Sequence, residues 1–313
     1  MPAQLCTATI CVRENNAERV KPLLGKTFPR GGAHIPHRKS GSDNKAIVLM
    51  PAPEEVVIPL SQHIGAPAKP LVAPGDKVLL GQLIGEPQGF ISAAVHSSVS
   101  GTVTALEPRP TMIGEKVLSV VIKNDGQDKL VSTKRRDYKT MSAESIRAAA
   151  RDGGLVGMGG AGFPTHVKLA PPETLDAVLV NGAECEPYLT CDHRLMVEQA
   201  EDMVYGLKAA MKAVGAKKGY IAIELNKPDA IDAVGDIIVG DESLEVVPLK
   251  IHYPQGAEKQ LIKAVLNREV PSGALPSAVG CLVQNVHTLI ALSDARQRGL
   301  PLYQRVFTVS GKS

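Results

Sequence analysis

The sequence contains no tryptophan, and aromatic residues occupy only 3% of its 313 positions. Proteins that bind single-stranded nucleic acid stack the bases on several aromatic side chains set among basic residues, and this chain has no such pattern. A formal net charge of +3 is also too small to indicate a nucleic-acid partner. The one basic run, residues 134–136, lies next to Asp137 and is typical of a solvated linker.

Long apolar runs are also absent. No stretch approaches the roughly 20 apolar residues that span a bilayer, so we expect no membrane span in this chain. The short apolar run near the N-terminus has Arg13 after it rather than before it, which does not fit a signal peptide. If the protein acts at a membrane, other subunits must therefore hold it there.

The cysteines do not fit a secreted disulfide framework, because their number is odd and their spacing irregular. We therefore expect a reducing, cytoplasmic setting. No C-x-x-C-x-x-C run is present, so the usual ligands of an iron–sulfur cluster are missing. Two cysteines and two histidines near the N-terminus have spacings that are unorthodox for zinc, and we predict no metal site from them: Cys6, Cys11, His34 and His37.

Residues 47–122 form short β-like runs separated by turns rich in glycine and proline, which predicts a compact all-β module. Residues 75–84 followed by 97–103 resemble the barrel-sandwich hybrid of biotinyl and lipoyl carrier domains. Carriers present a modifiable lysine on the hairpin between these two segments. Here no lysine occurs between Lys77 and Lys116, and the tip is Gly89-Phe90-Ile91, so we expect the scaffold without the carrier function.

After a polar linker the pattern changes to alternating helices and strands, which predicts an α/β layer with a largely parallel sheet. Ser142 caps a first helix that stops at Gly153-Gly154, and one long amphipathic helix is expected from Asp192 to Val214. The predicted division is an N-terminal extension, the barrel-sandwich hybrid and the α/β domain, at residues 1–45, 46–127 and 138–313.

The segment Gly157–Thr165 contains G-x-G-x-x-G, the pattern of dinucleotide-binding loops. That fingerprint requires a strand directly before it, whereas a helix is predicted here, so we reject the ordinary Rossmann placement. Four glycines in six positions still allow the backbone to approach a ring or a phosphate closely, with its amides exposed as donors. A purely structural glycine-rich turn is the alternative.

Three further polar segments follow predicted strands, where ligands of open α/β sheets bind. Asn181–Pro187 offers an amide and two carboxylates. Tyr253–Gln260 opens a helix whose amides, with Lys259, suit an anion. Val283–Thr288 brings two side-chain amides and a hydroxyl that suit a phosphate. Each segment alone is a weak signal.

Together with Gly154–Thr165 and Lys168, these segments resemble the FMN-binding domain of the NADH-oxidising flavoprotein subunit of respiratory complex I. The similarity to the RnfC family, a component of Rnf-type electron transport complexes, extends over nearly the whole chain. It includes the strings Gly31–His34, Ile58–Pro67, Gly89–Ala93, His96–Gly101 and Tyr253–Ile262. The fold class that this resemblance implies is an all-β barrel-sandwich hybrid followed by an α/β, Rossmann-like FMN-binding domain.

The resemblance also implies the site. FMN would be lined by Gly157, Gly159, Gly160, Lys168, Asn181, Glu184, Gln284, Asn285 and Thr288, and the nicotinamide nucleotide by Phe163, Glu186 and Tyr253. No side chain is assigned as catalytic, because the flavin carries the chemistry. Two positions depart from the complex I pattern: Ala183 stands where that family has Asp, and Met158 replaces an Arg, so two polar contacts to the ligands are lost.

The implied function is hydride exchange between NAD(H) and FMN in an ion-translocating ferredoxin:NAD+ oxidoreductase complex. The expected partners are the other subunits of this membrane complex and, through it, ferredoxin, with the chain peripheral at the cytoplasmic face of the inner membrane. Family members continue into a region with [4Fe-4S] clusters, which we expect to be missing here because the sequence stops at Ser313. The alternatives are an electron-transfer subunit of a soluble reductase such as proline reductase, and a non-catalytic docking scaffold.

Three histidines and one cysteine complete the candidates. His34 is expected to orient a loop or to approach the flavin. His63 and His96 lie in the most family-like strings of the β module, where satisfied structural histidines are the simpler interpretation. Cys185 lies in the flavin-side loop without a partner at metal or disulfide spacing, so we expect an inert side chain.

Overall fold

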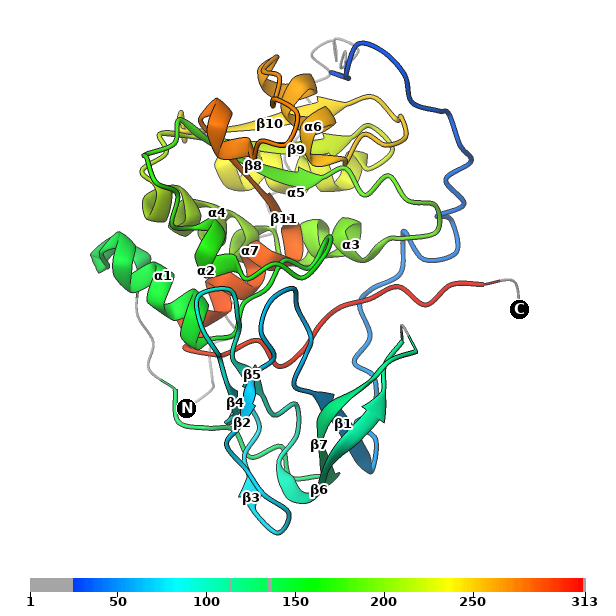
Figure 1. Ribbon diagram of the computed structural model, residues 1–313. Helices are drawn as coiled ribbons and strands as arrows, with labels where there is room; N and C mark the ends of the chain where they lie inside the picture. The colour runs from blue at the N-terminus through cyan, green and yellow to red at the C-terminus, as the bar shows by residue number, and fades with distance from the viewer. Residues whose placement is uncertain (1–24, 113, 134–136, 312–313) are drawn as a thin grey trace, which may run out of the picture.

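The computed structural model describes residues 25–112, 114–133 and 137–311. Cys6, Cys11 and the basic run at 134–136 lie outside these ranges. The chain forms a β module and a larger α/β domain, which lie at the bottom and the top of Figure 1. In the described ranges, no helix is both long enough and apolar enough to cross a membrane.

The β module consists of two sheets around one apolar core. The first sheet has the order β1 (Glu55–Pro59), β7 (Lys116–Asn124), β6 (Gly101–Pro110) and β3 (Lys77–Val78), and the second has the order β2 (Lys69–Pro70), β4 (Leu83–Glu86) and β5 (Val95–His96). Ile84, Val120 and Ile122 are fully buried between them. This arrangement confirms the barrel-sandwich prediction.

The α/β domain is built on a parallel sheet of order β10 (Leu244–Leu249), β9 (Lys218–Glu224), β8 (Ala177–Gly182) and β11 (Cys281–Asn285). Successive side chains of a strand point to opposite faces. In β8, Val178 and Val180 therefore pack into one core cluster and Ala177 and Leu179 into another. Both faces are covered, as is usual for parallel sheets, and the α/β prediction is confirmed.

Helices cover the two faces unequally. One face carries α1 (Ala143–Asp152), α3 (Cys191–Glu198), α4 (Ala200–Val214), α5 (Pro228–Ile238) and α7 (Val286–Ser293), whereas α6 (Glu258–Leu266) packs on the other. The short α2 (Thr165–Lys168) follows the glycine loop, and 3-10 turns lie at Tyr138–Thr140 and Pro276–Val279.

The prediction of one continuous helix from Asp192 to Val214 is wrong. Gln199 has φ −134° and ψ 36°, which ends α3 and begins α4. The bend lets Leu195 of α3 and Met203 of α4 both reach the same core. A straight helix drifts away from a curved core surface, so tertiary packing outweighs helix propensity at this position.

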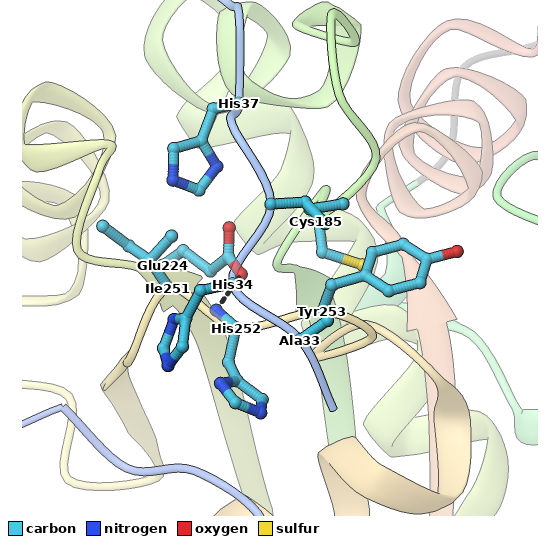
Figure 2. Close-up of a pocket in the computed structure, with 9 residues that line it drawn as sticks. Ala33, His34, His37, Cys185, Glu224, Ile251, His252 and Tyr253 are labelled. Carbon is cyan, nitrogen blue, oxygen red and sulfur yellow. Dashed lines mark hydrogen bonds between the residues drawn. The ribbon is translucent and has the colours of Figure 1, made fainter. Parts of the chain in front are cut away.

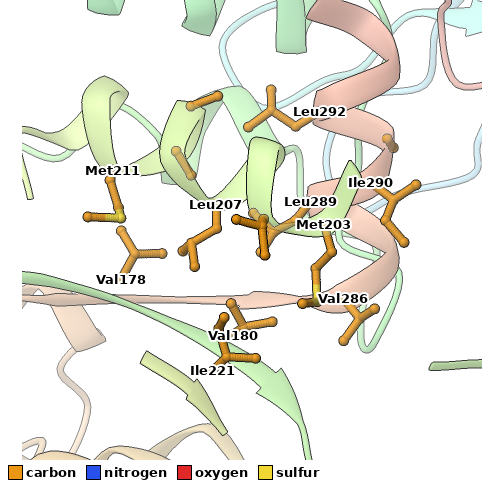
Figure 3. Close-up of a cluster of buried hydrophobic side chains, with 14 of the residues drawn as sticks. Val178, Val180, Met203, Leu207, Met211, Ile221, Val286, Leu289, Ile290 and Leu292 are labelled. Carbon is orange, nitrogen blue, oxygen red and sulfur yellow. The ribbon is translucent and has the colours of Figure 1, made fainter. Parts of the chain in front are cut away.

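The position of α7 is fixed by a close crossing with α4. Figure 3 shows Leu207 and Met203 of α4 between strand residues such as Val180 and the α7 residues Val286 and Leu289. At Gly206 a Cβ atom would lie 1.9 Å from the carbonyl oxygen of Leu289, so only glycine allows this approach. The crossing places the start of α7 directly behind the end of β11.

Residues 25–45, hereafter the N-terminal strap, run along the α/β domain rather than away from it (blue in Figure 1). Lys26 forms a parallel bridge to Leu249, and Ala33 forms an antiparallel bridge to Tyr253. Phe28 is buried, with its ring 4.9 Å from that of His252. The strap therefore borders the loop that follows β10.

The β module contacts the α/β domain next to the glycine loop. A Cβ atom on Gly154 would lie 2.2 Å from the carbonyl oxygen of Ala94, and one on Gly162 would lie 3.3 Å from that of Gln62. His166 of α2 lies 3.3 Å from the carbonyl oxygen of Phe90. The hairpin tip that replaces a carrier lysine is thus packed against the domain that carries the candidate site.

Candidate functional site

The glycine loop, residues 157–163, is a closed turn between α1 and α2. An antiparallel bridge joins Val156 to Pro164, and the amide of Gly157 donates to the carbonyl of Phe163 at 2.9 Å. The element before the loop is helix α1. The decision against an ordinary Rossmann placement is therefore confirmed.

Four successive amides of this loop are free to bind a ligand. The N–H groups of Gly159, Gly160, Ala161 and Gly162 donate to no acceptor among the described residues. A Cβ on Gly160 would have no described atom within 4 Å, apart from its chain neighbours. Successive backbone donors beside open space form an anion- or acceptor-binding concavity, which fits a flavin and its phosphate.

The end of β11 and the start of α7 hold the glycine loop in place. The Asn285 side chain caps α7 by accepting from the amides of His287 and Thr288. The Thr288 hydroxyl accepts from the Met158 amide at 3.0 Å. A Cβ on Gly159 would lie 2.7 Å from Asn285 Nδ2, so the loop and the cap are in direct contact.

Asn285 also connects this region to the loop after β8. Its Nδ2 donates to Asp192 Oδ2 at 2.6 Å, and the Asp192 amide donates to Glu184 Oε1 at 2.7 Å. Burial, together with the nearby Glu184 carboxylate, raises the pKa of Asp192 to about 7. Sequence reasoning did not select Asp192, although it directly begins the helix after a predicted site loop.

The loop after β8 carries the remaining carboxylates. Asn181 Nδ2 donates to the carbonyl of Gly256 at 2.8 Å, which joins the ends of β8 and the loop after β10. Tyr253 donates through its hydroxyl to Glu186 Oε1 at 2.9 Å. That hydrogen bond, with the charge of Glu186, raises the pKa of Tyr253. The two predicted nucleotide-side residues are therefore adjacent.

Lys168 and Gln284 complete the predicted set. Lys168 Nζ donates to the carbonyl of Val283 at 2.9 Å and lies 3.2 Å from Glu258 Oε1. Gln284 is 3% exposed, and its Nε2 has no hydrogen-bond partner among the described residues. An unpaired buried amide is costly, so a ligand acceptor would relieve it.

A small cavity of about 50 Å³ lies between the strap and the loops after β8, β9 and β10 (Figure 2). Its size suits water and is too small for a nucleotide, since ligand pockets measure about 300 Å³ or more. Its walls are Ala33, His34, Ile35, His37, Cys185, Glu224, Ile251, His252 and Tyr253.

The two lysines that support the same loops were not selected from the sequence. Lys227 is fully buried, donates to the carbonyl of Ala183 at 2.6 Å and lies 3.4 Å from Glu224 Oε2. Lys39 of the strap donates to three carbonyls of the loop after β8. A lone lysine outside any motif gave no signal.

The C-terminal segment, residues 300–311, crosses the site (red in Figure 1). Arg305 donates to the carbonyl of Met158 at 2.5 Å, and the Thr308 hydroxyl accepts from the Thr190 amide at 3.0 Å. This segment therefore contacts both the glycine loop and the loop after β8.

The other candidates have structural surroundings. His34 packs edge-on against His252 with ring centroids 4.7 Å apart. His63 accepts from the Ala93 amide and contacts the Ile64 carbonyl, so both ring nitrogens are paired. Lys259 donates to the carbonyl of Pro271 and is turned away from the anion role expected for it. Burial raises the pKa of the Cys185 thiol, which fits an inert side chain.

Comparison with known proteins identifies two tandem families. Residues 26–127 match the RnfC barrel sandwich hybrid domain, and residues 150–294 match the Nuo51 FMN-binding domain. The chain is 52% identical over 287 residues to the C-type subunit of the Na+-translocating ferredoxin:NAD+ oxidoreductase complex of Acetobacterium woodii, a match that covers 90% of this chain and 65% of the relative.

Two more relatives have similar names. The corresponding subunit of the proton-translocating ferredoxin:NAD+ oxidoreductase complex of Clostridium ljungdahlii is 47% identical, over 91% of this chain and 63% of the relative. That of the ion-translocating oxidoreductase complex of Pseudomonas aeruginosa is 40% identical, over 91% of this chain and 37% of the relative. The chain thus spans less than two thirds of the length of these relatives. An NAD+-reducing [NiFe]-hydrogenase structure matches 53% of this chain and 36% of its own, at 26% identity and a TM-score of 0.42.

Proposed function

The chain belongs to the RnfC family, and from that membership we propose that it binds FMN and NAD(H) and exchanges a hydride between them. The proposed setting is a ferredoxin:NAD+ oxidoreductase complex, as the names of its relatives say of them. The domain division at residues 1–45, 46–127 and 138–313 belongs to the same proposal.

One observation carries the proposal. The unpaired amides of residues 159–162 lie beside the carboxyl ends of β8 and β11, where parallel sheets bind their ligands. Gly160 has open space in front of it, so nothing in the described chain prevents a flat ring from reaching the backbone. The unpaired Nε2 of Gln284 adds a donor that is already desolvated.

The proposed FMN residues have different tasks. The glycines provide close approach and amide donors, and Asn285 with Thr288 holds that loop against α7. Asn181, Glu184 and Gln284 offer polar groups to the ring edge and the ribityl hydroxyls. Lys168 is a positive charge near the phosphate, but it also contacts Glu258. The full set is Gly157, Gly159, Gly160, Lys168, Asn181, Glu184, Gln284, Asn285 and Thr288.

The proposed nucleotide side is the pair Glu186–Tyr253 together with Phe163. The hydrogen bond between Tyr253 and Glu186 fixes the direction of a carboxylate that accepts from ribose hydroxyls. Phe163 ends the glycine loop and offers a ring face for stacking. Bound FMN supplies the hydride chemistry when the nicotinamide lies on it, and the protein supplies the orientation.

The partners follow from the same family. We propose that other subunits of a membrane complex bind this chain at the cytoplasmic face of the inner membrane, and that electrons are exchanged with ferredoxin through [4Fe-4S] clusters held elsewhere. The described part of the chain would then be the nicotinamide end of the electron path.

A titration tests the proposal. The chain is mixed with increasing FMN under anaerobic conditions, and binding is read from the change in flavin fluorescence. Saturable binding is expected, and subsequent NADH should bleach the visible absorbance of the bound flavin. If folded protein leaves FMN fluorescence unchanged at saturating concentration, the redox function is wrong and a docking scaffold is the better interpretation.

A further inference from the structure

We infer that Lys39 is a positioning residue of the flavin site: from the N-terminal strap, it holds the loop after β8 in shape and balances the charge of Glu184. This inference rests on the proposed function, because it assumes that the loop faces FMN. Lys39 lies some 145 positions before that loop in the sequence, so the strap belongs to the site even though it lies outside the α/β domain.

The ammonium group of Lys39 uses all of its donors on one loop. It donates to the carbonyls of Glu184 at 2.9 Å, Glu186 at 3.0 Å and Leu189. A lysine ammonium has three N–H groups, so its hydrogen-bonding capacity is filled by these carbonyls. Three carbonyls converging on one cation enforce the curvature of the loop.

The loop needs such support because part of its backbone is strained. Glu184 has φ +45° and Tyr188 has φ +68°, a region that residues with a side chain rarely adopt. Such conformations persist only where the surroundings enforce them. The strap provides a second contact here, since the Tyr188 amide donates to the carbonyl of His37 at 2.9 Å.

Lys39 also faces a buried carboxylate. Its Nζ lies 3.7 Å from Glu184 Oε2, and the two side chains are 7% and 2% exposed. Glu184 Oε1 is occupied by the Asp192 amide, whereas Oε2 has no hydrogen bond among the described residues. Burial lowers the pKa of Lys39, and the Glu184 carboxylate acts in the opposite direction. Removing the ammonium would leave a buried negative charge with a poorer balance.

The second buried lysine does not replace it. Lys227 supports the same loop at the carbonyl of Ala183, but its nearest carboxylate is Glu224 at 3.4 Å. Glu224 and Lys227 are three residues apart and form their own pair. Lys39 is therefore the lysine whose ion pair reaches the predicted flavin-contacting carboxylate.

The test compares Lys39→Met with Lys45→Met in the full chain. Methionine keeps the length of the apolar stem and removes the charge, and Lys45 is an exposed lysine of the same strap. Dissociation constants for oxidised and reduced FMN are measured for both variants and for the unmodified protein. Lys39→Gln is made in parallel and takes the place of Lys39→Met if thermal unfolding shows that the latter does not fold.

Lys39→Met is expected to weaken oxidised FMN binding about tenfold or more, while Lys45→Met has no effect. Reduced FMN should lose more affinity than oxidised FMN, because an unbalanced Glu184 repels the electron-rich ring. A tenfold difference between the two forms corresponds to about 30 mV for a two-electron couple. A purely structural lysine would lower thermal stability without this redox difference. Adding Glu184→Gln to Lys39→Met should remove most of it.

Two negative results have different meanings. If the unmodified protein and Lys45→Met bind FMN and Lys39→Met binds both redox forms equally well, the role of Lys39 is refuted and the proposed function stands. If neither the unmodified protein nor Lys45→Met binds FMN, the proposed function itself is refuted and the inference falls with it.

Discussion

Gly159 and Gly160 are neighbours in the chain, but their surroundings are different. A Cβ on Gly159 would press on the Asn285 side chain at 2.7 Å, whereas one on Gly160 would enter open space. The first glycine therefore serves the packing of the loop, and the second leaves room for something outside the protein. This difference separates a structural turn from a binding surface.

Gly160→Ala is expected to abolish FMN binding or to weaken it about tenfold or more without changing the fold. The added methyl group meets no described atom, so the free energy of unfolding should stay within about 0.5 kcal/mol of the unmodified value. FMN titration and chemical unfolding measure the two effects. Gly235→Ala is the matched control, because that position in α5 is equally open and lies outside the site.

Asp192 predicts a dependence of stability on pH. Burial raises its pKa from 3.8 to about 7, so between these values the folded state binds a proton that the unfolded state releases. Its contribution is therefore complete below pH 4 and is lost as the pH rises through 7, with a slope of at most about 1.4 kcal/mol per pH unit.

Urea unfolding of the unmodified protein and of Asp192→Asn, from pH 4 to pH 8, isolates this contribution. Asparagine still accepts from Asn285 but does not titrate. The stability of the unmodified protein relative to the variant should fall across this range. A constant difference would show that Asp192 titrates normally in the folded protein.

The predicted site residues came from motifs at strand ends, and the structure brings most of them into contact. Asn285 touches the glycine loop, and Tyr253 is bonded to Glu186. Asp192, Lys39 and Lys227 were not predictable, because the burial of a charged side chain depends on segments far away in the sequence. No local pattern marks a lysine whose acceptors are carbonyls 145 residues later.

At the scale of elements, periodicity predicted the strands and most helices, but it could not locate the break at Gln199. Both halves of the expected helix have apolar residues at helical spacing, and the bend arises from the surface on which they pack. The same holds for the α4–α7 crossing: Gly206 reads as an ordinary helical glycine until its contact with Leu289 is known.

Gly206→Ala is therefore expected to destabilise the protein, although alanine is the better helix former by about 1 kcal/mol. The methyl group would overlap the carbonyl of Leu289, and overpacking of this kind costs about 3 kcal/mol. Because α7 carries Thr288 and is capped by Asn285, weaker FMN binding should accompany the loss of stability. Gly235→Ala in α5 should instead be neutral or slightly stabilising. Equal unfolding midpoints for the two variants would contradict the close-crossing argument.

At the scale of the whole molecule, the β module acts as a wall of the site region rather than as a separate carrier. Its loops at Gln62 and Phe90 lie against the glycine loop and α2. The family-like strings predicted in the β module thus include the surface that meets the α/β domain. The sequence indicated both folds, but their contact could not be predicted, because each string also satisfies the geometry of its own module.

His96 links this contact to pH. It is 8% exposed in β5, and its Nδ1 would lie 3.3 Å from a Cβ on Gly154 of the α/β domain. Burial lowers its pKa from 6.5 to about 4, so the folded state resists a proton that the unfolded state accepts. The contribution of His96 is present above pH 6.5 and is lost as the pH falls through 4.

His96→Gln should flatten the fall in stability between pH 6.5 and pH 4, by at most about 1.4 kcal/mol per pH unit. Chemical unfolding of both proteins across this range measures the difference. His287 has a pKa lowered to about 4 by burial in α7, and it titrates in both proteins, so the difference reports His96 alone. Since protonated His96 would place a charge where the two domains meet, FMN affinity should decline over the same range only in the unmodified protein. Parallel stability curves would show that the domain contact tolerates the charge and that His96 does not couple the β module to the flavin site.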